Sequence, residues 1–125
     1  MADSIQTTLQ TRHQSHGDFR YVSAMSQNLK RTLKSSRSFE DLEQWQQESL
    51  EAICLKLARI MSGNSFDPDH WHDIAGYASL VVREIERREI EYQLEQGVRK
   101  AAEEAARQPP NMEELIREMP DEPRE

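Results

Sequence analysis

Apolar residues recur every three or four positions along most of this chain, which is the period of an amphipathic α-helix. The clearest stripes run through residues 19–34 and 42–60. No strand-like alternation of apolar and polar residues persists, and the sequence contains no internal repeat. The pattern therefore predicts an all-α protein built as a small helical bundle.

Start and stop signals divide the first half of the chain into three helices. Ser4 can cap a first helix that stops near Gly17, and a second helix from Phe19 should end in the serine-rich segment 35–38. Ser38 with Asp41 three residues later resembles a capping box, which predicts that a third helix begins there and continues to residues 62–64.

A long fourth helix is predicted from Asp67 as N-cap and Pro68 as first helical residue. No proline occurs at residues 69–107, so this helix can run for some forty residues, or about 60 Å. Its apolar stripe changes face after Ile85, which indicates a change of packing partner. Asn111 can cap a short acidic tail helix that Pro120 ends.

These elements predict a bundle domain at residues 1–85, an extended charged helix at residues 86–107 and an acidic tail at residues 108–125. Only 36% of the residues are hydrophobic and 6% are aromatic, so the core should be thin. A thin core and an overlong helix favour a homo-oligomer.

Charge and targeting signals narrow the class of protein. The net charge of −7 argues against general nucleic-acid binding, although residues 1–37 carry six basic groups against two acidic ones. No apolar run is long enough for a membrane span, and the first residues do not resemble a signal peptide. A cytoplasmic protein is expected, with the lone Cys54 as a buried, inert thiol.

Paired carboxylates on two helices suggest a metal site. Asp69 and Asp73 stand one helical turn apart, as do Glu48 and Glu51 on the preceding helix. If these helices pack antiparallel, the four carboxylates could converge on one or two Mg²⁺ ions and support phosphohydrolase chemistry. The alternative is structural: an Asp73–Arg59 or Asp69–Lys56 ion pair would fix the two helices to each other.

A second group of residues suits an anionic ligand. Arg12 with His16-Gly17 could close over a phosphate through the guanidinium and backbone N–H groups. The alternatives are that Gly17 simply stops a helix and that Arg12 is a solvated cation. His70 and His72 point to different sides of a helix, so they do not predict a zinc site.

Several of these residues also carry a resemblance to known families. The segments Arg12-x-x-x-His16-Gly17-Asp18-Phe19, Lys56-Leu-Ala-Arg59-Ile60 and Asp69-His-Trp-His-Asp73-Ile-Ala-Gly-Tyr77 resemble a family of small, mostly phage- and prophage-encoded helical proteins of unassigned function. Lys-x-x-Arg followed by Asp-x-x-x-Asp and an aromatic residue is similar to the phage nucleotide-modification-associated domain. A more distant similarity is to MazG-like all-α nucleotide pyrophosphohydrolases.

The resemblance implies an all-α fold and a nucleotide-related role. MazG-like enzymes rely on a Glu-x-x-Glu and a later Glu/Asp-x-x-Asp pair. Glu48-x-x-Glu51 fits the first, whereas Asp69 and Asp73 are one residue further apart than the second requires. The resemblance therefore implies nucleotide binding more directly than it implies Mg²⁺-dependent hydrolysis.

Two functions are expected from these observations. In the first, a phage-type protein binds a nucleotide or related phosphate compound between the third and fourth helices. Phosphate would meet Lys56, Arg59, Arg12 and His16, while Asp69 and Asp73 hold Mg²⁺ or orient those cations and Tyr77 stacks on a base. In the second, a non-enzymatic phage protein in the host cytoplasm binds and inhibits a host protein through its charged helix and acidic tail.

Overall fold

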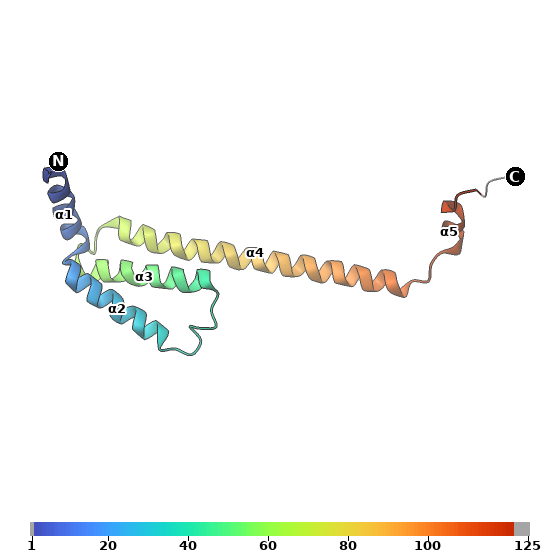
Figure 1. The fold of residues 1–125 in the computed structure, drawn as a ribbon, viewed down its shortest axis with the longest axis horizontal. Coiled ribbons are helices and arrows are strands. Elements are labelled where there is room, and N and C mark those ends of the chain that lie inside the picture. Colours follow the sequence, from blue (N-terminus) through green and yellow to red (C-terminus); the bar gives the residue numbers. More distant parts are fainter. Residues whose placement is uncertain (1, 122–125) are drawn as a thin grey trace. The chain divides into compact units, whose positions relative to one another are not determined.

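All regular secondary structure in the described part of the chain, residues 2–121 of this computed structural model, is helical (Figure 1). The helices are α1 (Ala2–His16), α2 (Phe19–Lys34), α3 (Gln44–Ser62), α4 (Pro68–Arg107) and α5 (Met112–Glu118). The all-α class, the long fourth helix and the short helix that follows it are confirmed.

Short polar side chains begin three of these helices where the sequence places them. The carboxylate of Asp18 accepts a hydrogen bond from the backbone N–H of Arg20 at 2.9 Å, which caps α2. Asp67 accepts from the N–H of Asp69 at 3.0 Å at the start of α4. The side chain of Asn111 accepts from the N–H of Glu113 at 3.2 Å at the start of α5.

The predicted start of α3 at Ser38 is wrong. Residues 35–43 form turns, and α3 begins at Gln44 with a capping box in which the N–H of Glu43 donates to the side chain of Gln46 at 3.0 Å. A capping box needs a long Glu or Gln side chain that reaches back, and Asp41 is too short to provide it. The turns instead bury Phe39, whose carbonyl oxygen accepts from Gln47 at 2.9 Å.

The chain divides into two compact units, an N-terminal unit of residues 1–85 and a C-terminal unit of residues 86–125. In the N-terminal unit α2 packs along α3, and the first part of α4 runs antiparallel beside α3 (Figure 1). The buried apolar side chains of this unit are Val22, Phe39, Cys54, Ala58 and Ile60. Three of them lie on α3, which is therefore the central helix of the unit.

Cys54 is buried as the sequence predicts, with 4% of its surface exposed. Burial raises the pKa of the Cys54 thiol above its ordinary value. Because the thiolate is the reactive form, a raised pKa makes this thiol a poor nucleophile near neutral pH.

Large apolar side chains of the C-terminal unit are exposed. On the last part of α4, Ile90, Leu94 and Val98 follow one another at intervals of four residues and are 60%, 65% and 71% exposed. Met112, Leu115, Ile116 and Met119, on and just after α5, are also exposed. None of the helices among residues 2–121 has the length and apolar character needed to cross a membrane.

Candidate functional site

The end of α1 and the end of α3 meet through two glycines. Gly17 has a φ of +86° and its N–H donates to the carbonyl oxygen of His13 at 2.8 Å, which ends α1. A Cβ atom at Gly17 would lie 2.2 Å from the carbonyl oxygen of Ser62, and one at Gly63 would lie 2.1 Å from that of Ser15. Side chains at these two positions would therefore prevent the two backbones from meeting.

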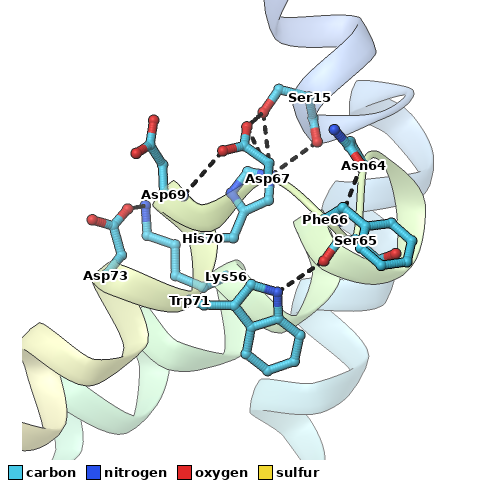
Figure 2. A network of polar contacts seen from close by, with 10 residues as sticks. All are labelled: Ser15, Lys56, Asn64, Ser65, Phe66, Asp67, Asp69, His70, Trp71 and Asp73. Carbon is cyan, nitrogen blue, oxygen red and sulfur yellow. Dashed lines mark hydrogen bonds and ion pairs between the residues drawn. The ribbon is translucent and has the colours of Figure 1, made fainter.

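The imidazole of His70, on α4, binds to the junction at which the ends of α1 and α3 meet (Figure 2). It is 2% exposed, and its Nε2 atom lies 2.9 Å from the carbonyl oxygen of Ser15. A carbonyl oxygen can only accept, so Nε2 is the donor. The backbone N–H of Asn64 donates to the same oxygen at 2.9 Å. One carbonyl group of α1 therefore joins the end of α3 and the start of α4.

Asp67 and Trp71 complete this junction (Figure 2). The Ser15 hydroxyl donates to the Asp67 carboxylate, and this hydrogen bond is the main reason that the pKa of Asp67 lies below its ordinary value. The Trp71 indole N–H donates to the carbonyl oxygen of Ser65 at 2.9 Å and closes the turn between α3 and α4.

The trio of Ser15, His70 and Asp67 does not have the geometry of a hydrolytic triad. In such a triad the serine and the carboxylate contact opposite nitrogens of the imidazole. Here the Ser15 hydroxyl lies 3.3 Å and the Asp67 carboxylate 3.9 Å from the same atom, Nε2 of His70. The arrangement is that of a structural hydrogen-bond network.

An ion pair joins α3 to α4 (Figure 2). The Lys56 ammonium lies 2.9 Å from the Asp73 carboxylate, and this contact holds the pKa of Asp73 below its ordinary value. The sequence suggests an Asp73–Arg59 or an Asp69–Lys56 pair between these helices, whereas the structure pairs Lys56 with Asp73. A lowered carboxylate pKa stabilises the folded state above the ordinary pKa, and this contribution is lost as pH falls.

Two of the four carboxylates proposed as metal ligands form ion pairs with lysines. Glu51 pairs with Lys34 of α2 at 2.8 Å, and Asp73 pairs with Lys56. Across residues 2–121, no three or more His, Cys, Asp or Glu side chains form a group that could hold a metal ion. Mg²⁺ binding through Glu48, Glu51, Asp69 and Asp73 stays a prediction.

A cavity of about 380 Å³ lies between α1, α2 and α3, and we call it the cationic pocket. Its lining combines two arginines and two histidines with apolar side chains and contains no carboxylate. The lining residues are Leu9, Arg12, His13, His16, Gly17, Phe19, Val22, Ser23, Leu55 and Arg59.

The surroundings of the cationic pocket affect the pKa of His16. Burial lowers the pKa of this imidazole below its ordinary value, and the positive charge of Arg59 lowers it further. Smaller contributions in the same direction come from His70, Lys56 and Arg12. Burial and the surrounding positive charge therefore both disfavour protonation of His16.

The structure brings together four of the predicted ligand-binding residues, Arg12, His16, Gly17 and Arg59. Lys56 and Tyr77 are not among the residues that line the cationic pocket. The sequence predicts the ligand between α3 and α4, where the structure has a hollow of about 280 Å³ with no charged lining residue. Its lining is Leu42, Gln46, Ser49, Leu50, Ile53, Ala78 and Val81.

The sequence did not predict the α2 wall of the cationic pocket, which Phe19, Val22 and Ser23 form. Val22 is on the predicted apolar stripe of residues 19–34, and such a stripe predicts a core residue rather than a pocket wall. Phe19 directly follows the Gly17-Asp18 turn, and this proximity is the signal that could have placed it beside His16.

Neither a protein-family model, nor a curated protein, nor a solved structure matches this chain.

Proposed function

We propose that the N-terminal unit binds a small phosphate compound, such as a mononucleotide, in the cationic pocket. The observation that carries the proposal is the lining itself, which has four side chains able to carry positive charge and no carboxylate. This composition stands out in a chain with 23 acidic residues and a net charge of −7. A local cationic surface of this kind attracts anions even when the whole protein repels them.

Arg12 and Arg59 are the groups that would bind the phosphate most strongly. A guanidinium presents several N–H donors in a rigid plane that matches two phosphate oxygens at once. Arg12 lies on α1 and Arg59 on α3, so the two cations belong to different walls of the pocket. His13 and His16 supply further N–H donors from α1.

The remaining lining residues suit an apolar or aromatic body. Leu9, Val22 and Leu55 are aliphatic, and Phe19 is 83% exposed and offers an aromatic face for stacking. Phe19 takes the stacking role that the sequence analysis assigns to Tyr77. Apart from the arginines and histidines, Ser23 is the lining side chain that can form hydrogen bonds, so the pocket has few groups with which to distinguish one base from another.

The size of the cationic pocket limits the ligand. Pockets for small molecules have volumes of roughly 300–1,000 Å³, and this pocket of about 380 Å³ is near the lower end. One mononucleotide is therefore a better match than a dinucleotide or a polymer.

The proposal is tested by calorimetric titration of the full chain with AMP, GMP, CMP, UMP and adenosine. We expect the four monophosphates to bind with affinities within about a factor of five of one another, because stacking does not depend strongly on the base. Adenosine should bind at least about tenfold more weakly, because it lacks the charge that the arginines recognise. If none of the monophosphates binds, the proposal is wrong.

The same titrations with and without Mg²⁺ test the metal prediction that comes from the family resemblance. A Mg²⁺-dependent gain in affinity would support a role for Asp69 and Asp73, and equal affinities would count against it. Analysis of the mixtures for products tests whether binding is followed by hydrolysis.

A second candidate function, binding of a host protein, is favoured by the C-terminal unit. The exposed side chains of Ile90, Leu94 and Val98 lie on one face of α4, and α5 adds further exposed apolar side chains. An apolar helical face of this kind is what a partner groove or helix recognises. Residues 108–125 would add an acidic surface to it.

Deletion of residues 108–125 tests this second function. We expect the deletion to abolish capture of a host protein, because it removes the exposed apolar residues of α5 together with the acidic groups. The shortened chain should keep its nucleotide affinity and its melting temperature, which serve as controls. Undiminished capture by the shortened chain would exclude the tail as the binding element.

A further inference from the structure

We propose that the cationic pocket binds its anion together with a proton, which the imidazole of His16 holds. This inference rests on the proposed function and adds its regulation by pH. It begins from geometry: His16 lines the pocket at the end of α1, and its ring centroid lies 5.2 Å from that of the buried His70. The imidazole is therefore in contact with both the ligand space and the junction of the helices.

The groups around His16 come from each neighbouring element and are mostly cationic. Arg12 and His13 belong to α1, Lys56 and Arg59 to α3, and His70 to α4, while the α2 residues in the lining (Phe19, Val22 and Ser23) carry no titratable group. The carboxylate of Asp67 also interacts with His16, and it already accepts hydrogen bonds from Ser15 and from the N–H of Asp69.

This environment favours the neutral form of His16 when the pocket is empty. Burial is the main cause of its lowered pKa, and the charge of Arg59 is the second. An anion between the arginines would supply the negative charge that the pocket lacks. It would offset their repulsion of the imidazolium and could accept its N–H hydrogen bond. Anion binding therefore raises the pKa of His16 and takes up a proton.

Linkage fixes the direction of the pH dependence. If binding takes up a proton, the affinity rises as pH falls from the raised pKa of the occupied state to the lowered pKa of the empty state. Below the lowered pKa, His16 is protonated in both states and contributes no further change. Within this window one proton changes the affinity by at most about tenfold per pH unit.

The test is calorimetric titration of the full chain with AMP near pH 7 in two buffers of different ionisation enthalpy. The buffer dependence of the heat gives the number of protons taken up on binding. The phosphate of AMP titrates in the same range, so the informative quantity is the difference between the wild-type protein and the His16→Gln variant. His72→Gln is the matched control, because His72 is exposed on α4 and does not line the pocket.

We expect wild-type protein and His72→Gln to take up more protons than His16→Gln, by up to about one proton per AMP. The ratio of wild-type to His16→Gln affinity should also grow as pH falls through the histidine range. Equal proton uptake by wild type and His16→Gln would overturn this inference and leave the proposed function standing. Absence of AMP binding by the wild-type protein would overturn both.

A measurement on the wild-type protein avoids any effect of the substitution on folding. The ring protons of His16 can be followed by NMR as a function of pH, with and without saturating AMP. We expect AMP to raise the pKa of His16, whereas the ring-proton signals of His72 should not respond to AMP. An AMP-independent pKa at His16 would contradict the proposal even if His16→Gln does not fold.

Discussion

Replacement of Gly63 by alanine should lower the free energy of unfolding of the N-terminal unit by about 2–4 kcal/mol. The added Cβ would lie 2.1 Å from the carbonyl oxygen of Ser15 and 2.6 Å from the carbonyl carbon of His16. Both atoms are backbone, so relief requires movement of α1 away from α3. That movement stretches the hydrogen bonds that Asn64 and His70 donate to Ser15.

Gly76→Ala is the matched control for this substitution. Gly76 lies within α4, and a Cβ there would meet nothing within 4 Å. We expect Gly76→Ala to raise the free energy of unfolding by about 0.5–1 kcal/mol, because alanine is the better helix former. Urea unfolding followed by circular dichroism measures both variants. A Gly63→Ala protein as stable as the wild type would contradict the close contact between α1 and α3.

Removal of the Arg59 charge should weaken phosphate binding about 10- to 100-fold, since charge-assisted hydrogen bonds contribute about 1.5–3 kcal/mol each. Arg59→Met is the appropriate substitution, because methionine keeps most of the apolar stem and removes the guanidinium. Arg59 also lowers the pKa of His16, so the variant should bind AMP with a weaker dependence on pH. Calorimetric titration with AMP measures both effects.

Arg83→Met controls for the loss of one positive charge. Arg83 is exposed on α4 and does not line the cationic pocket, so this variant should keep wild-type affinity. Melting temperatures of both variants show whether the fold is retained. If Arg59→Met binds AMP as tightly as Arg83→Met does, the ligand does not occupy the cationic pocket.

Most helix boundaries could be predicted from the sequence because they depend on local chemistry. Asp18, Asp67 and Asn111 each satisfy backbone N–H groups within three residues of their own position. The start of α3 could not be predicted in this way. It depends on the burial of Phe39 against the rest of the unit, and a tertiary contact of this kind has no local signal.

The sequence predicts four of the residues that line the cationic pocket, but it predicts the ligand between α3 and α4 and not between α1, α2 and α3. Arg12, His16 and Arg59 have the chemistry of phosphate ligands, but which helices bring them together depends on the contact of Gly17 with the end of α3. The sequence did not predict the structural role of His70 in the segment from Asp69 to Asp73. The His70 imidazole is buried and donates a hydrogen bond to the backbone carbonyl of Ser15, which is 55 residues away in the sequence.

The most direct test of a phosphate-binding pocket between α1, α2 and α3 is an NMR titration of the isotope-labelled full chain with AMP. The backbone amide shifts should change most at residues 12–23 and 55–59, which include most of the pocket lining. Little change is expected at residues 74–85, whose Ala78 and Val81 line the apolar hollow between α3 and α4. Shift changes centred on residues 74–85, or no shift changes at a large excess of AMP, would contradict phosphate binding in the cationic pocket.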